Sequence, residues 1–295
     1  MDSVQDIAGE PGHYNQDTLK AMDQQTPGGV YLCQVGPQIS CGACCGLYNV
    51  PHLSRPELTE MLSRRTLRFA ATARTVAAIE AYALETARLE PQQRPFPELH
   101  HCPYIGLIGE APGRVGCLLH PLADGNGGVD LRGLSYYGGM ACRTYFCATT
   151  KELLPRWKSV LRQVLNHWYL FGIVVTEKDM LAAMLAQLES RLGRPLEPVM
   201  DANSPAADSL RALLGLKCRW PFRPLSHATA CHYLFSDNAH PKPAVDYEAL
   251  GTAPSVHDGI LREMPSAFKT VNELRQAEAL IDNHMSATVK AIQKE

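Results

Sequence analysis

Hydrophobic positions recur at helical spacing over most of this 295-residue chain. The first such pattern begins at Ser54, where Glu57 completes a capping box and Pro56 lies in the first turn. Apolar side chains then follow at three- to four-residue steps, sometimes two steps apart, as an amphipathic helix requires. The proline-rich segment 91–97 ends the pattern, so it predicts one long helix. Its expected buried face is Leu58, Leu62, Phe69, Ala73, Val76, Ala83 and Ala87.

Helical patterns resume after residue 150. An apolar stripe over 154–168 is followed by a helix over 176–193, which Thr176 is expected to cap and a glycine to end. A short helix is expected after Pro205 and a last long one from about Ser266. The expected buried face of this last helix is Val271, Leu274, Ile281, Met285, Val289 and Ile292.

Two regions lack this periodicity. Residues 1–40 are polar and predict a loose arm, with at most a short strand near Val30–Val35. Residues 98–148 are rich in glycine and carry four cysteines. Because so long a loop is uncommon unless something organises it, a bound metal is a natural explanation.

The pattern therefore predicts a mainly α protein, with helices packed around an irregular, metal-organised cysteine-rich region. We expect a polar arm over 1–40 and a cysteine-cluster metal-binding domain with one long helix over 41–148. A helical region over 149–295 is expected to pack on that domain as one unit.

Composition narrows the function classes. The net charge is −2, which gives no electrostatic signal for binding nucleic acid or an anionic membrane. The N-terminus lacks the basic and apolar regions of a signal peptide. The best apolar run, 168–175, is far shorter than the roughly 20 residues of a membrane helix. We therefore expect a cytoplasmic protein with neither a nucleic-acid nor a membrane partner.

In a reducing cytosol, clustered cysteines indicate metal binding or catalysis rather than disulfides. Cys41 and Cys44 have the two-residue spacing of a thioredoxin-like site, but no helix begins here until after Ser54. Metal binding fits better, because closely spaced thiolates select soft or borderline metals. Adjacent Cys44 and Cys45 usually point apart, so they can serve different ions or different corners of a cluster.

Further candidate ligands lie in the glycine-rich region. His120 follows Cys117 at a possible second ligand spacing, and Cys33 is a possible eighth thiol that we interpret as an ordinary buried side chain. Four ligands make one structural zinc or one 4Fe-4S cluster, and seven or eight permit two sites. The predicted metal ligands are Cys41, Cys44, Cys45, Cys102, Cys117, Cys142 and Cys147.

Three further sequence features bear on the site. Arg143, beside Cys142, is either a surface charge or a donor of hydrogen bonds to cluster sulfurs, which would raise a reduction potential. Tyrosines near these cysteines are expected to cover the site. Cys218 and Cys231 lack a partner at ligand spacing and are expected to act as small hydrophobes.

The cysteine segments SCGACC, CP at 102–103, GCLLHP at 116–121 and ACRTYFC at 141–147 resemble a known family. This is the cysteine-cluster family with a zinc- or iron-chelating domain of the CxxCxxCC type. The first cysteine of the family motif falls at Gln38 in this chain. The resemblance implies a metal or iron–sulfur site and defines no biochemical activity.

Three hypotheses follow. The first is an iron–sulfur protein with an electron-transfer or redox role and an unknown redox or protein partner. The second is a structural zinc module, in which the thiolates contribute folding energy and a helical surface binds a partner. Metal sensing or delivery is a third. The sequence contains no P-loop, zinc-protease or hydrolase motif, so it names no catalytic residue and leaves enzyme activity open.

Overall fold

The structure, a computed structural model, describes residues 16–50, 54–90, 93–97, 99–109, 113–197, 200–224 and 243–295. These residues are mainly helical, as the sequence predicts, with one small antiparallel hairpin. The N-terminal half contains α1 (Gln16–Gln25), η1 (Ala43–Cys45), α2 (Arg55–Ala70), α3 (Val76–Leu89), β1 (Ile105–Ile108), β2 (Arg114–Cys117), η2 (Arg132–Leu134) and α4 (Gly138–Thr144). The C-terminal half contains α5 (Ala148–Glu152), α6 (Pro155–Val164), α7 (Trp168–Val174), α8 (Lys178–Leu192), α9 (Pro205–Leu214), α10 (Leu216–Arg219), α11 (Asp258–Glu263) and α12 (Val271–Ile292).

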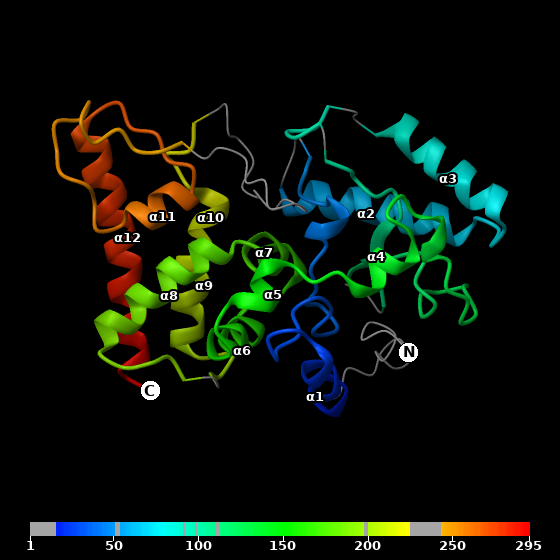
Figure 1. Cartoon of the computed structure of the whole chain (residues 1–295), viewed down its shortest axis with the longest axis horizontal. Helices are drawn as coiled ribbons and strands as arrows, with labels where there is room; N and C mark the ends of the chain where they lie inside the picture. Colours follow the sequence, from blue (N-terminus) through cyan, green and yellow to red (C-terminus); the bar gives the residue numbers. More distant parts are fainter. Residues whose placement is uncertain are drawn as a thin grey trace.

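The helices form two ends with a middle layer between them. Helices α8, α9, α11 and α12 gather at one end of the molecule and α2, α3 and α4 at the other, with α1 and α5 to α7 between (Figure 1). No helix of the described residues has the length and apolar character needed to span a membrane.

The buried apolar side chains of the described residues form three clusters, around which the helices and the hairpin pack. The helical core is drawn mainly from residues 22–35, 146–220 and 260–292. The central core comprises Ala43, Leu47, Tyr48, Val50, Leu58, Leu62, Ile105, Val115, Trp168 and Ile173. The aromatic core comprises Phe69, Ile79, Tyr82, Cys102, Tyr104, Leu118 and Leu119.

The predicted capping signal at Ser54 and the predicted short helix after Pro205 are both present. Ser54 caps α2 by accepting a hydrogen bond from the Glu57 amide at 3.3 Å. The short helix after Pro205 is present as α9, capped by Ser204. Helix α8 ends at Gly193, whose φ of 68° is the left-handed conformation that glycine adopts without strain.

Several predicted boundaries are wrong. The long helix expected before residue 91 is two helices, because the Thr75 hydroxyl caps a new helix by accepting from the Ala78 amide at 3.3 Å. Arg74, in the connection, donates to the Phe69 carbonyl at 2.8 Å and so binds the end of α2. The expected stripe over 154–168 is likewise divided between α6 and α7.

Two other helix starts also differ from the prediction. Thr176 does not cap α8, since Glu177 occupies the N-cap position without a side-chain hydrogen bond. The last helix begins at Val271 rather than near Ser266, because Thr270 and Glu273 form a capping box there.

The N-terminal segment differs most from the prediction. Residues 16–25 form α1, and the segment expected as part of a loose arm places Tyr31 and Leu32 in the helical core. Asp23 forms an ion pair with Arg162 at 2.7 Å, and the Lys158 ammonium donates to the Gly28 carbonyl at 2.6 Å. Instead of a strand, this segment forms one isolated bridge, between Gln34 and Ser40.

The hairpin organises part of the glycine-rich region. Strands β1 and β2 pair antiparallel, with Ile105 opposite Cys117. Thr66 of α2 fixes the hairpin by accepting from the Leu107 amide at 2.8 Å and donating to the Leu107 carbonyl at 3.0 Å. These contacts fix the position of Cys117, which is the last residue of β2.

Candidate metal centre

The cysteines of the first 150 residues surround one cavity of about 230 Å³. All seven predicted ligands line it, and so does Cys33, which the sequence interpretation left out. All the described cysteines are free thiols. Cys218 lies outside this lining, and Cys231 falls outside the described residues. The lining thiols are Cys33, Cys41, Cys44, Cys45, Cys102, Cys117, Cys142 and Cys147.

The turn at 41–46 supplies three of these thiols. The Ala43 amide donates to the Cys41 sulfur at 3.5 Å, and the Cys41 amide donates to the Cys33 carbonyl at 2.7 Å. A Cβ at Gly42 would lie 2.7 Å from Ile105 Cδ1, so only glycine lets this turn approach the hairpin closely. The turn therefore lies close to β1, and its Cys41 is hydrogen-bonded through the backbone to Cys33.

The segment before the hairpin and the hairpin itself each contribute one more thiol. The Cys102 amide donates to the Cys45 carbonyl at 2.9 Å. Cys117 follows from the register of the hairpin, since it pairs with Ile105 three residues after Cys102. Thiols far apart in sequence are thus connected through backbone hydrogen bonds.

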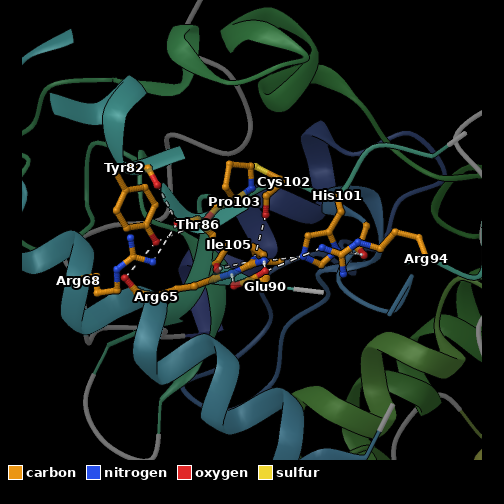
Figure 2. A network of polar contacts seen from close by, with 11 residues as sticks. Arg65, Arg68, Tyr82, Thr86, Glu90, Arg94, His101, Cys102, Pro103 and Ile105 are labelled. Atoms are coloured by element: carbon orange, nitrogen blue, oxygen red, sulfur yellow. Dashed lines mark hydrogen bonds and ion pairs between the residues drawn. The ribbon is translucent and has the colours of Figure 1, made fainter. Parts of the chain in front are cut away.

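A buried arginine fixes Cys102 from the helix side (Figure 2). Arg65 of α2 donates to the Cys102 carbonyl at 3.1 Å and to the Ile105 carbonyl at 3.3 Å. Its charge is balanced by Glu90, with Nε–Oε1 at 2.6 Å. Figure 2 shows these groups converging from α2, α3 and the segment before the hairpin.

His101 belongs to this network and is not available as a metal ligand. Its Nδ1 lies 2.8 Å from the Gly46 carbonyl, which only accepts, so Nδ1 carries the proton. Its Nε2 then accepts from Arg65 Nη2 at 2.6 Å. Burial and the charge of Arg65 hold the pKa of His101 well below its usual value, so the ring is neutral.

Cys142 and Cys147 lie in different surroundings although they are five residues apart. Cys142 is in α4, with its sulfur 3.4 Å from the Ser135 hydroxyl. Cys147 precedes α5, with its sulfur 3.3 Å from the Thr150 hydroxyl. Between them Phe146 enters the helical core and packs edge-on against Tyr31, with ring centroids 6.5 Å apart.

Burial sets the protonation of most of these thiols. It raises the pKa of Cys102 to about 12 and raises those of Cys33, Cys41 and Cys117. Cys44 is different, because a hydrogen bond from the Cys45 side chain lowers the pKa of Cys44. Without metal the set is therefore mostly neutral, and thiolates form as metal displaces their protons.

Two arginines, Arg132 and Arg143, pair with Asp130 near the cavity. Arg143 forms an ion pair with Asp130, its side chain is 39 % exposed, and it is not among the cavity-lining residues. Arg132 lines the cavity, is buried, and pairs with Asp130 at 2.9 Å. Burial raises the pKa of Cys117, and the Arg132 charge opposes that rise. Arg132 could not be predicted from the sequence, because it is ten residues from the nearest cysteine.

The remaining predicted residues close the cavity. His120 lines it, and its Nδ1 accepts from the Leu122 amide at 3.1 Å. His100 stacks on Tyr136 with centroids 4.2 Å apart, and Tyr137 and Tyr145 also line the cavity, in agreement with a covering role for the tyrosines.

In the part of the chain that the structure describes, no three His, Cys, Asp or Glu side chains converge closely enough to hold one ion. The thiols surround a space rather than a point. Comparison with protein-family models, curated proteins and solved structures gave no match. The resemblance to the cysteine-cluster family stays a prediction.

Proposed function

We propose that this chain is an iron–sulfur protein with an electron-transfer or redox role. The observation that carries the proposal is the gathering of eight thiols around one cavity. Thiolate is the donor that iron–sulfur clusters use, and four thiolates hold one cubane cluster. The donor chemistry therefore fits such a group, and so does the family resemblance of the cysteine segments.

The volume of the cavity adds to this argument. A Zn–S bond is about 2.3 Å long, so one zinc ion draws four sulfurs toward a single point. A cluster of irons and sulfides occupies a volume and keeps its cysteine sulfurs apart. The thiols line a cavity of about 230 Å³ rather than a single point, which favours the second arrangement.

The surroundings suit a redox group. When bound, an iron–sulfur cluster supplies a carrier for one electron, whose potential depends on burial, net charge and hydrogen bonds to sulfur. Here the aromatic core packs on one side of the cavity. The guanidinium of Arg132, paired with Asp130, opposes the rise in the pKa of Cys117, and that of Arg65, paired with Glu90, opposes the rise in the pKa of Cys102.

The rival function is a structural zinc module that uses the same thiols. Purification of the full chain without oxygen, followed by assays of iron, zinc and acid-labile sulfide and a visible spectrum, separates the two. We expect a brown protein with equal amounts of iron and sulfide. A colourless protein that contains zinc and no sulfide would contradict the proposal.

A matched pair of variants shows whether the metal is held by these thiols. Cys117→Ala removes a thiol that lines the cavity, and we expect the bound iron to fall. Cys218→Ala removes a half-buried thiol that packs on the central core outside the cavity, so the iron content is expected to stay unchanged. Equal iron content in both variants would mean that the metal is bound elsewhere.

A further inference from the structure

Helix α3 is apolar on nearly all of its faces, although it lies at the outside of the molecule. Its 14 residues include only three charged side chains, Glu80, Glu85 and Arg88. A helix that is apolar all round is normally buried within a protein. Helix α3 instead lies at the edge of the molecule, at the end opposite α12 (Figure 1). The composition of α3 therefore predicts more burial than a single copy of the chain provides.

One face of α3 packs on the aromatic core. The buried residues of the helix are Ile79, Tyr82 and Thr86, which recur at three- and four-residue steps. Tyr82 packs edge-on against Phe69, with ring centroids 5.1 Å apart. The Tyr104 hydroxyl donates to the Ile79 carbonyl at 3.1 Å. These contacts fix α3 on the protein and so determine which of its faces is turned outward.

The opposite face of α3 is exposed. Successive residues of a helix are rotated by about 100°, so the positions farthest from the buried face can be read from the sequence. This outer face consists of Ala77, Ala81, Leu84 and Arg88. Leu84 in its middle is 63 % exposed, and Val76 and Leu89 at the two ends of the helix are exposed to a similar extent. The outer face is therefore apolar along most of its length.

Helix α2 shows how a face that contacts only water differs. Its exposed positions include Arg55, Glu60 and Arg64, and Arg64 pairs with Glu60 at 2.5 Å. Leu67 is exposed there as a single apolar side chain among charged ones, which is ordinary for a protein surface. A contiguous apolar face, by contrast, marks a site of interaction. Helix α3 has such a face and α2 does not.

The two charged residues beside Leu84 are placed symmetrically about it. Glu80 lies four residues before Leu84, and Arg88 lies four residues after it. Glu85 is paired with Arg68 of α2 at 2.6 Å, whereas within the described residues neither Glu80 nor Arg88 forms an ion pair. They cannot pair with each other, because eight residues of helix separate them by about 12 Å.

An antiparallel pair of α3 helices would bury the apolar face and pair both charges. A two-fold axis brings the same surface of two copies together, so a residue four positions before the axis faces the residue four positions after it. With the axis at Leu84, Glu80 of each copy lies opposite Arg88 of the other. A parallel pairing would place Glu80 opposite Glu80 and Arg88 opposite Arg88, which repel. The charges therefore favour the antiparallel arrangement.

We propose that the outer face of α3 is a dimerisation surface, and that its partner is the same face of a second copy of this chain, packed antiparallel. A stable interface covers roughly 800 Å² on each partner, and one helix of this length offers less. We therefore expect a dimer that dissociates on dilution. The cavity and its thiols take no part in this surface, so the proposal does not depend on which metal the protein binds.

Sedimentation velocity of the full chain over a dilution series tests the proposal. The wild type is expected to change from dimer to monomer as it is diluted. Leu84→Glu places two carboxylates against each other at the axis and is expected to abolish the dimer. The matched control is Val256→Glu, at a site that is 82 % exposed and precedes α11 at the other end of the molecule, and it is expected to leave the dimer unchanged. A wild type that is monomeric at every concentration, or a dimer that Leu84→Glu leaves intact, would overturn the proposal.

Charge reversal tests the antiparallel pairing. Glu80→Arg and Arg88→Glu each replace an attraction by a repulsion, and the two-fold axis repeats this change in the second copy. We expect each single variant to raise the Kd of the dimer roughly tenfold, which is the combined effect of several exposed ion pairs. The combined variant restores opposite charges across the interface and is expected to return the Kd to near its wild-type value. Weakening in both single variants without recovery in the combined variant would overturn the antiparallel pairing.

A measurement on the wild type guards against variants that do not fold. Amide hydrogen exchange of the unaltered protein is compared at a concentration where it is a dimer and at one where it is a monomer. We expect residues 76–89 to exchange more slowly in the dimer, because a packed helix opens less often. A dimer in which exchange slows elsewhere and not in α3 would show that another surface forms the interface, and would overturn the proposal.

Discussion

Gly46 and Gly29 adopt nearly the same left-handed backbone, with φ of 74° and 75°, but their surroundings differ. A side chain at Gly29 would meet nothing within 4 Å, whereas a Cβ at Gly46 would clash with the carbonyl oxygen of His100. Gly46 follows the cysteine turn directly and, through its own carbonyl, holds His101. A single missing Cβ therefore sets how closely the turn approaches the segment that carries Cys102.

We predict that Gly29→Ala lowers the free energy of unfolding by about 1–2 kcal/mol, the cost of a left-handed conformation alone. Gly46→Ala adds a backbone clash to the same cost, so we expect a larger loss of stability together with reduced iron binding. Urea unfolding and iron analysis of both variants check this. Equal losses in the two variants would mean that the close approach at Gly46 contributes nothing.

Part of the lining of the cavity could be predicted residue by residue from the sequence. Seven cavity thiols could be predicted because their spacing and clustering carry chemical meaning without a fold. Cys33 and Arg132 could not, because each reaches the cavity through contacts with distant parts of the chain, such as the hydrogen bond between Cys41 and Cys33. The sequence around a single cysteine or a single arginine contains no motif that predicts which residues it contacts.

Helices α6 and α8 are joined by one carboxylate, Glu189. It accepts from Arg156 Nε and from Trp157 Nε1, both at 2.8 Å, and from the Leu196 amide at 2.9 Å. The hydrogen bond from Arg156 is the largest of the influences that lower the pKa of Glu189 to about 2. One side chain thus fixes the spacing of two helices and the chain reversal after α8.

We predict that Glu189→Gln lowers the free energy of unfolding at pH 7 by about 2 kcal/mol, the scale of hydrogen bonds to a charged group. Because the folded pKa of Glu189 lies below its unfolded value of 4.5, this stabilisation is present above pH 4.5 and is lost as the pH falls toward 2. Urea unfolding at several pH values measures the difference between wild type and variant. A difference that stays constant from pH 7 to pH 2.5 would contradict this account.

Local sequence signals predicted some helix boundaries, and contacts between distant parts of the chain determined others. The start of α2 follows from its capping residue Ser54, as predicted, and α9 is the short helix expected after Pro205. The break between α2 and α3 was missed, because Arg74 holds the turn through a hydrogen bond of 2.7 Å to Asn126, fifty-two residues away. Helix α1 was missed because its sequence is mostly polar, and its Met22 is buried only by packing in the helical core.

On the scale of the whole molecule, the cavity lies where the irregular region meets the cores. Its walls include residues of α2, the hairpin and α4. They also include Tyr31 and Leu32, which follow α1 in the chain and belong to the helical core. The segments between the hairpin and α4 have little regular structure, so bound metal is expected to contribute much of their stability. The helical core needs no such contribution, because α8, α9 and α12 bury a continuous apolar interior.

We predict that removal of the metal increases amide hydrogen exchange mainly over residues 99–147, with α8, α9 and α12 remaining protected. The reason is that metal–thiolate bonds cross-link the irregular region, whereas apolar packing holds the helices. Hydrogen exchange of metal-loaded and metal-free protein, compared peptide by peptide, measures this. Uniform loss of protection in both regions would show that the metal stabilises the whole fold as a single unit.

The aromatic and helical cores differ in when the chain that forms them is synthesised. The aromatic core, together with Cys45, Cys102, Cys117 and Cys142, lies within residues 45–142, so all of it has been synthesised by the time α4 is complete. The helical core, on which Cys33 and Cys41 pack, extends to Ile292. At ~5–20 residues per second, synthesis of the remaining helices takes roughly 7–30 s. The residues that pack around Cys102 and Cys117 are therefore made well before the helical core that packs on Cys33 is complete.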